Sequence, residues 1–140
     1  MIKEFFGKYR FLSNFYPALV KINDISFPTV EHAYQALKTK DLSIRNEIAK
    51  LSTPLEAKRF GAKVKLRDNW DSFKYNGMYH LVFQKFKNNK ELRQLLMDTG
   101  DEQLMEGNCW HDTYWGFDLT TGEGENNLGK ILMEVRKELK

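Results

Sequence analysis

The spacing of apolar residues changes at Pro28, and this change constrains the fold class. Before the proline, Val20/Ile22 and Ile25/Phe27 form two short alternations around Asn23-Asp24, a pair that tolerates turn geometry. Period-two alternation around such a turn predicts a β-hairpin over residues 20–27. After the proline, apolar residues recur at three- and four-residue steps, which is typical of helices. The sequence therefore predicts an α+β protein that is mainly helical and carries a small β-sheet.

Helix starts and ends are marked by capping residues. The best-marked helix is "PLEAKRFG" (54–61), with Thr53 as cap, Pro54 in the first position, Glu56 in a capping box and Gly61 at its end. A second helix is capped by Thr29 and follows it directly. Periodicity predicts further helices over 43–51, 70–87 and 89–98, and from 127 to the end. The core is predicted to include Phe5, Phe6, Phe11 and Phe15.

Length and composition indicate one domain. The chain has 140 residues, and its 41% apolar and 14% aromatic content is enough for one packed core, so 1–140 is predicted to be a single domain. A lone cysteine, Cys109, favours a reducing, cytoplasmic location. The chain shows no signal-peptide pattern and no apolar stretch of membrane-spanning length, so no membrane partner is expected. The net charge of +3 is too small to define a nucleic-acid binder.

The least regular stretch, residues 107–125, is where function is expected, because long loops in compact domains are often working parts. It contains Cys109, His111 and Asp112, but one thiol, one imidazole and one carboxylate within four residues match no standard zinc spacing. The prediction is that the protein has no metal site and needs no cofactor.

The segment "GENNLGK" (124–130) satisfies the pattern G-x-x-x-x-G-K. Ile131 stands where a nucleotide-binding loop needs Ser or Thr, so an NTPase is not expected. Glycines and asparagines that enter a helix can present backbone N–H groups to an anion. The alternative is an ordinary helix start, capped by Asn126 or Asn127.

A basic run precedes a tryptophan at residues 58–70. Lys63, Lys65 and Arg67, together with Lys58 and Arg59, are followed by Trp70. Such runs are commonly solvated surface, but charge beside an aromatic plate also suits a phosphate-bearing ligand with a flat ring. Trp115, in the irregular stretch, is a candidate for a second plate.

Glu31 and His32 lie side by side in the first turn of the helix that follows Thr29. A first-turn glutamate is favoured by the helix dipole whatever its function, and His32 is expected to be exposed. If Glu31 and Asp112 converge beside Trp70 or Trp115, the site combines carboxylates with aromatic plates. That combination suits cleavage of a glycosidic bond, where positive charge develops on a sugar.

Five motifs in order resemble the YbiA-like or NADAR (NAD- and ADP-ribose-associated) family. They are "FLSNFYP", "FPTVEHAYQALK", "LRDNW", "LMEGN" followed by "HDTYWG", and "GENNLGKILMEVR", and the resemblance runs from about Phe5 to Leu139. It implies a mainly helical domain that acts as an N-glycosidase on nucleotide-like substrates. Members are associated with ribosylamino intermediates of riboflavin synthesis, or with removal of ADP-ribose from guanine.

The resemblance also implies site residues. The family's essential glutamate corresponds to Glu31, its tryptophans to Trp70 and Trp115, and its aspartate to Asp112, while Asn14 and Asn108 match further site positions. Apart from the resemblance, the basic run suggests that Lys63, Lys65 or Arg67 meets phosphate. The segment "FDLTTGEGENN" after Gly116 departs from the shorter glycine-rich link expected in relatives.

Two other classes of function stay open at this stage. A module that binds ADP-ribose or a related nucleotide without cleaving it would use the same plates and basic residues. A nucleic-acid-binding protein would bind through the basic run with a steep salt dependence. The expected partner is a small nucleotide-like substrate or an ADP-ribosylated nucleic-acid base, and the oligomeric state is left open.

Overall fold

Helices dominate the computed structural model, which describes all residues from 1 to 140. In chain order the elements are η1 (Gly7–Leu12, a 3-10 helix), β1 (Val20–Ile22), β2 (Ile25–Phe27), α1 (Val30–Leu37), α2 (Leu42–Ala49), α3 (Pro54–Gly61), α4 (Trp70–Lys87), α5 (Lys90–Asp98), β3 (Gly107–Asn108), β4 (Phe117–Asp118) and α6 (Asn127–Glu138). The predicted α+β class, mainly helical with little sheet, is confirmed.

The chain divides into two compact units, and each is described by itself. One unit is Asn14–Lys85, and the other consists of Met1–Ser13 together with Phe86–Lys140. The single domain expected over residues 1–140 is not decided by this division and stays a prediction. None of the helices is both long and apolar enough to span a membrane.

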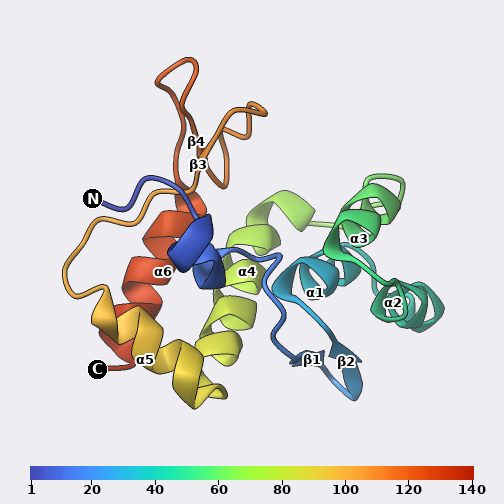
Figure 1. Cartoon of the computed structure of the whole chain (residues 1–140). Coiled ribbons are helices and arrows are strands. Elements are labelled where there is room, and N and C mark those ends of the chain that lie inside the picture. Colours follow the sequence, from blue (N-terminus) through green and yellow to red (C-terminus); the bar gives the residue numbers. More distant parts are fainter. The chain divides into compact units, whose positions relative to one another are not determined.

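Helix α1 is the centre of the unit Asn14–Lys85. It packs against α2 and α3 and against the strands of the hairpin, as Figure 1 shows. All of its residues from Val30 to Leu37 are buried, so the helix has no solvent-facing side. Polar side chains on α1 must therefore find partners inside the protein.

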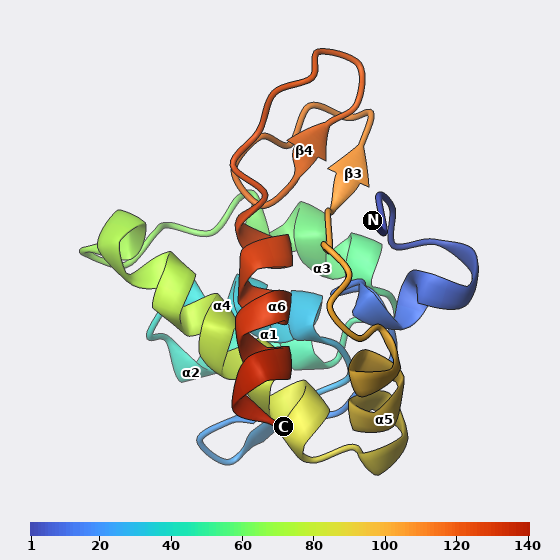
Figure 2. The same cartoon turned by 90° about the vertical axis from the view of Figure 1, so that its left-hand side faces the viewer.

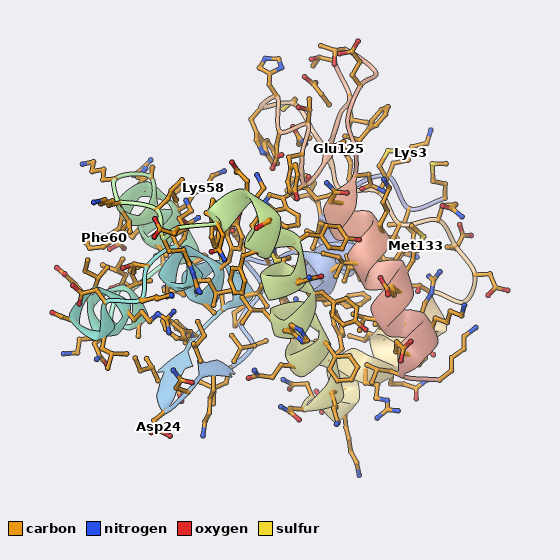
Figure 3. All side chains as sticks on the ribbon, turned by 180° about the vertical axis from the view of Figure 1, so that it is seen from behind. Lys3, Asp24, Lys58, Phe60, Glu125 and Met133 are labelled. Atoms are coloured by element: carbon orange, nitrogen blue, oxygen red, sulfur yellow. The ribbon has the colours of Figure 1, made fainter.

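The predicted hairpin is confirmed. Strands β1 and β2 pair antiparallel, with Val20 opposite Phe27 and Ile22 opposite Ile25. Asn23 takes a positive φ of 53°, which asparagine tolerates better than most residues. Asp24 lies at the tip of the hairpin (Figure 3).

The helix starts follow the capping residues, with shifts of one residue at α2 and at α5, which begins at Lys90 rather than at 89. Thr53 accepts a hydrogen bond from the Glu56 N–H at 3.1 Å, and α3 spans the predicted residues. Helix α2 begins one residue earlier than predicted and ends two residues earlier, because the side chain of Asp41 caps it by accepting from the N–H groups of Ser43 and Ile44. Gly61 is still helical and is followed by Ala62 with φ −64°, so it is not a left-handed C-cap.

In the second unit, two arginine side chains connect the ends of α5 and α6: Arg93 is half-buried and Arg136 is buried. Arg93 donates to the Leu139 carbonyl at 2.6 Å, and Arg136 donates to the Thr99 hydroxyl at 2.9 Å. Figure 2 shows β3 and β4 at the base of a long loop beyond the start of α6. Glu125 lies just before this helix and Met133 along it (Figure 3).

Two features of this unit were not predicted. Strands β3 and β4 pair parallel, with Gly107 opposite Phe117, inside the stretch expected to be irregular. The chain start also forms η1.

Of the phenylalanines assigned to the core, Phe5 and Phe11 are buried, but Phe6 is 58% exposed. Phe15, in the first unit, is 37% exposed, so the assignment was wrong for Phe6 and Phe15.

Candidate functional site

Glu31 is held in the first turn of α1, where only 9% of the residue is exposed. Its backbone N–H donates to the carbonyl of Asn14 at 3.1 Å. The side chain of Asn14 in turn donates to the sulfur of Met78, on α4, at 3.5 Å. The structure therefore brings together two of the residues predicted for the site, Glu31 and Asn14.

His32 is fully buried, so the expectation that it is exposed was wrong. Its Nε2 lies 3.0 Å from the Leu51 carbonyl, which can only accept, so the proton of the ring is on Nε2. Its Nδ1 then accepts from the Thr29 hydroxyl at 2.7 Å, while the same oxygen accepts from the His32 backbone N–H. Burial lowers the pKa of His32, which favours this neutral form. His32 therefore anchors the start of α1 beside Glu31.

Two polar residues were missed by the sequence analysis, one in α1 and one at its C-cap. Gln35 donates from Nε2 to Oε2 of Glu31 at 2.5 Å, and Lys38 donates from Nζ to the Gly61 carbonyl at 3.3 Å. Burial lowers the pKa of Lys38, and the charge of Glu31 acts in the opposite direction. Both residues follow Glu31 at helical spacing, four and seven residues on, and this was the signal that could have found them.

Trp70 lies at the start of α4 in an aromatic cluster. Its ring centroid is 5.4 Å from that of Tyr34, on α1, and 6.2 Å from that of Phe73. Trp70 is 7% exposed, so most of the ring is packed against protein. The predicted tryptophan is thus in the same unit as Glu31 and contacts the same helix.

The structure separates the residues of the basic run. Arg67 is only half-buried, and its guanidinium lies over the ring of Phe73, 4.3 Å from the centroid. Its backbone N–H donates to the Lys38 carbonyl at 2.7 Å. Lys63 and Lys65 are exposed. Arg67 is therefore the cation that the fold fixes beside the aromatic cluster, and Lys63 and Lys65 are surface charges.

A second group of predicted residues lies in the loop of the other unit. The Asn108 side chain donates to the Asp112 carbonyl at 3.0 Å and accepts from the Asp112 N–H at 3.1 Å. Oδ1 of Asp112 accepts from the N–H groups of Tyr114 and Trp115. Asn108, Asp112 and Trp115 are therefore adjacent, and one oxygen of the aspartate shapes the loop.

The first turn of α6 is closed by this loop. The N–H groups of residues 125–128 donate to the carbonyls of Thr113, Gly116, Tyr114 and Trp115, respectively. The suggested anion cradle in this segment was wrong, because these four N–H groups already have partners. Asn126 is the cap residue, but its side chain bonds instead to the backbone of Glu106 and Leu104.

An imidazole and a carboxylate pair across the same loop. His111 Nδ1 lies 2.6 Å from Oδ2 of Asp118, a residue that is almost fully buried. Oδ1 of Asp118 accepts from the N–H and the hydroxyl of Thr120. His111 has φ 67°, an unusual conformation for a residue other than glycine. No group of three or more His, Cys, Asp or Glu side chains lies in a metal-binding arrangement.

Chemically, the unit Asn14–Lys85 offers a buried carboxylate, an amide that donates to it, an amine and an aromatic cluster with a fixed guanidinium. A carboxylate in such a site can stabilise a cationic sugar or take a proton from water. Glu31 and Asp112 lie in different units, and the expectation that they act together stays a prediction.

Comparison with known proteins identifies relatives over nearly the whole chain. A model of the NADAR domain matches residues 3–140. N-glycosidase YbiA of Escherichia coli (strain K12) is 40% identical over 129 residues, covering 91% of this chain and 79% of that protein. N-glycosidase Npun_R5314 of Nostoc punctiforme is 40% identical over 137 residues, covering 94% of this chain and 86% of that protein.

A solved structure and a longer protein are also similar to this chain. The NMR structure of E. coli YbiA matches with a TM-score of 0.87 and 38% identity, covering 99% of this chain and 84% of that chain. Riboflavin biosynthesis protein VVA0006 of Vibrio vulnificus is 35% identical over 131 residues, which cover 92% of this chain but 35% of that protein.

Proposed function

The chain belongs to the NADAR domain family, and from this membership we propose that it is an N-glycosidase that hydrolyses the N-glycosidic bond of a ribosylated, nucleotide-like substrate. The family resemblance inferred from the sequence motifs is confirmed by the family model and by the match to the YbiA structure. Relatives named as N-glycosidases support a hydrolase acting on N-glycosyl compounds.

The observation that carries the proposal is the environment of Glu31. This carboxylate is buried at the start of α1 and accepts a hydrogen bond from Gln35, so it is held in one place. When the bond between the sugar and the nitrogen breaks, positive charge develops on the ribose. A fixed carboxylate in a site of low polarity stabilises that charge more strongly than water would.

In the proposed reaction, water adds to the anomeric carbon and the nitrogen leaves with the bonding electrons. Glu31 stabilises the cationic sugar or takes a proton from the attacking water, and the leaving nitrogen gains a proton. Asp112 is proposed to orient the water or the ribose hydroxyls. Asn14 and Asn108 are proposed to contact the substrate.

Binding of the substrate is proposed to use aromatic plates and cations. Trp70 and Trp115 hold the base or the sugar, and Arg67 meets a phosphate. Support for Arg67 comes from its fixed position over the Phe73 ring. Lys63 and Lys65 are exposed, and we propose that they meet phosphate at longer range or through a second phosphate group.

We propose two substrate classes, a ribosylamino intermediate of riboflavin synthesis and ADP-ribosyl-guanine, free or in nucleic acid. Both offer a ribose, a phosphate and a flat ring. The name of the Vibrio relative supports the first class. A cytoplasmic location and a single domain over residues 1–140 are part of the same proposal, and the family model that spans residues 3–140 supports the single domain.

A chromatographic assay tests the proposal. Wild type and Glu31→Gln are incubated with ADP-ribosyl-guanosine, ADP-ribose, NAD and the phosphorylated ribosylaminopyrimidine. We expect wild type to release a free base or amine, and Glu31→Gln to lose turnover while it keeps most of its affinity. Glu91→Gln is the matched control, because Glu91 also takes the second position of its helix but is exposed.

The alternative is a module that binds ADP-ribose or a related nucleotide without cleaving it. It predicts no turnover on any of the four compounds and binding that Glu31→Gln leaves unchanged. That result would reject the N-glycosidase proposal.

A further inference from the structure

The contact between Gln35 and Glu31 joins two buried side chains one turn apart on α1. Oε2 of Glu31 lies 2.5 Å from Nε2 of Gln35, which is the only nitrogen of that amide. Gln35 is 4% exposed and Glu31 is 9% exposed. Water therefore competes little for this hydrogen bond, and its donor points at the carboxylate of the proposed reaction.

Beside an ionised Glu31, the amide of Gln35 has only one acceptable orientation. If it turned over, its oxygen would face the carboxylate oxygen of Glu31, and two acceptors would meet unless Glu31 carried a proton. In the observed orientation Oε1 is buried and accepts no hydrogen bond from the chain. A buried acceptor without a donor is unfavourable, so the orientation satisfies Glu31 rather than Gln35.

Gly61, the last residue of α3, provides the space for this amide. A Cβ at position 61 would lie 1.9 Å from Oε1 of Gln35 and 2.5 Å from its Cδ. The backbone of Gly61 is helical, so no special φ requires glycine here, and glycine in a helix is unfavourable by about 1 kcal/mol relative to alanine. The space needed by the Gln35 amide therefore explains why residue 61 is glycine, whereas its backbone conformation does not.

The same residue also holds α1 through Lys38. The Lys38 ammonium donates to the Gly61 carbonyl at 3.3 Å. The end of α3 thus contacts both Gln35 and Lys38. Gly61 leaves space for the Gln35 amide because it has no side chain, and its carbonyl oxygen accepts a hydrogen bond from Lys38. A movement of α3 would therefore displace the Gln35 amide and change its hydrogen bond to the Glu31 carboxylate.

We propose that Gln35 is a positioning residue that holds the Glu31 carboxylate ionised and in one orientation, and that Gly61 acts as part of this arrangement by leaving room for the Gln35 amide. This inference rests on the proposed hydrolysis, in which Glu31 acts as an anion. Gln35 itself is not given a role on the substrate.

The first test is the pH profile of kcat/KM for Gln35→Met, which keeps the length of the side chain but has no donor. Loss of a hydrogen bond to the ionised form makes the carboxylate easier to protonate. We expect the acid limb of the profile to move up by about one to two pH units, the shift that corresponds to a hydrogen bond with a charged group. We also expect kcat to fall by about tenfold or more, with a smaller change in KM.

Two further variants separate positioning from folding. Gln35→Glu keeps the shape of the side chain but replaces the donor by a second carboxyl, and is expected to move the acid limb in the same direction. Gly61→Ala keeps the sequence of α1 and displaces the Gln35 side chain, whose Oε1, Cδ and Cβ all lie within 3.0 Å of the added Cβ, and is expected to give a similar shift. Because both positions act on one contact, the shifts of Gln35→Met and Gly61→Ala are not expected to add.

The matched control is Gln94→Met on α5. Gln94 donates to Asp98, four residues on, at 2.8 Å, so it forms the same kind of pair on an exposed surface. Its loss is expected to leave kcat/KM and the pH profile unchanged. A profile for Gln35→Met identical to that of wild type, with kcat retained, would overturn the proposal while leaving the hydrolase assignment intact.

A measurement independent of turnover distinguishes the two proposals. The titration of the Glu31 carboxyl carbon, followed by NMR in wild type, Gln35→Met and Gly61→Ala, reports the ionised state directly. An upward movement of the midpoint in both variants supports the positioning role even if wild type hydrolyses none of the four compounds. An unmoved midpoint in Gln35→Met rejects it.

Discussion

Replacing Lys85 by methionine is expected to change how the stability of the protein depends on pH. Lys85 lies on α4 with 1% exposure, and its Nζ is 5.8 Å from the centroid of the Tyr16 ring. Removal of the ammonium group from water disfavours its charged form, and burial lowers the pKa of Lys85 to about 7. In the unfolded chain the side chain is in water and its ordinary pKa of 10.5 returns.

The sign of the effect follows from proton binding. Between pH 7 and 10.5 the unfolded chain holds a proton at this residue that the folded chain lacks, so the free energy of unfolding rises with pH. One proton contributes about 1.4 kcal/mol per pH unit, which gives on the order of 5 kcal/mol across the window. Below pH 7 Lys85 is charged in both states, and the full cost of burying its ammonium group lowers the stability of the folded protein. Because methionine does not titrate, we expect Lys85→Met to be more stable than wild type at pH 6, by an amount that shrinks toward pH 10.

Urea unfolding followed by circular dichroism at pH 6, 8 and 9.5 measures this difference. Comparable m-values in the two proteins would show that the unfolded states are alike. Lys87→Met is the matched control, because Lys87 is an exposed lysine on the same helix. A constant difference between wild type and Lys85→Met over this range would refute the reasoning, since it would mean that Lys85 titrates alike in both states.

Two further predictions concern the unit that carries the loop. Hydrogen bonds from the Thr120 hydroxyl and from His111 hold the pKa of Asp118 below its usual range, so their stabilisation is present above about pH 4 and is lost as the pH falls. Amide hydrogen exchange in the loop should therefore show less protection at pH 3 than at pH 6, and equal protection would contradict this. A Cβ at Gly129 would lie 2.1 Å from the Leu104 carbonyl oxygen, so Gly129→Ala should destabilise the protein by about 2–4 kcal/mol in thermal unfolding. Gly77→Ala, which meets a Leu37 side-chain carbon at 3.0 Å, should change stability by less than about 1 kcal/mol, and similar losses in the two variants would count against the steric argument.

Features of the fold that depend on local chemistry were predictable from the sequence. Thr53 and Pro54 specify the start of α3 through contacts within one turn, and the structure places that start where it was predicted. The turn at Asn23 follows in the same way from its neighbours. The start of α2 was misplaced because Asp41 caps it, and the sequence offers several residues there that are able to cap.

Features that depend on distant partners were not predictable. The parallel pairing of Gly107 with Phe117 joins strands of two residues, which carry no periodic pattern. His32 was expected to be exposed because an amphipathic helix has a polar side. Helix α1 is buried all round, so its polar residues are held by hydrogen bonds to other parts of the chain instead.

In the candidate site, too, some features could be predicted from the sequence and others depend on distant partners. Family motifs indicated Glu31 and Trp70, and the structure places both on elements that contact through Tyr34. The motifs did not indicate Gln35 as a partner of the carboxylate, although the spacing of four residues was visible. The relation between Gln35 and Gly61 could not be found from sequence, since it depends on the volume that a missing side chain leaves between two helices.

The loop that closes the first turn of α6 has a consequence for how this protein can be re-engineered. Carbonyls of residues 113–116 are integral to the helix start, whereas residues 119–125 are exposed. In a chimaera, the outer turn could be exchanged for one of another length as a cassette, because the pairing of Asp118 with Glu123 closes it at its base. A graft of the inner segment would have to bring its own helix with it, so diversification of this loop is confined to its tip.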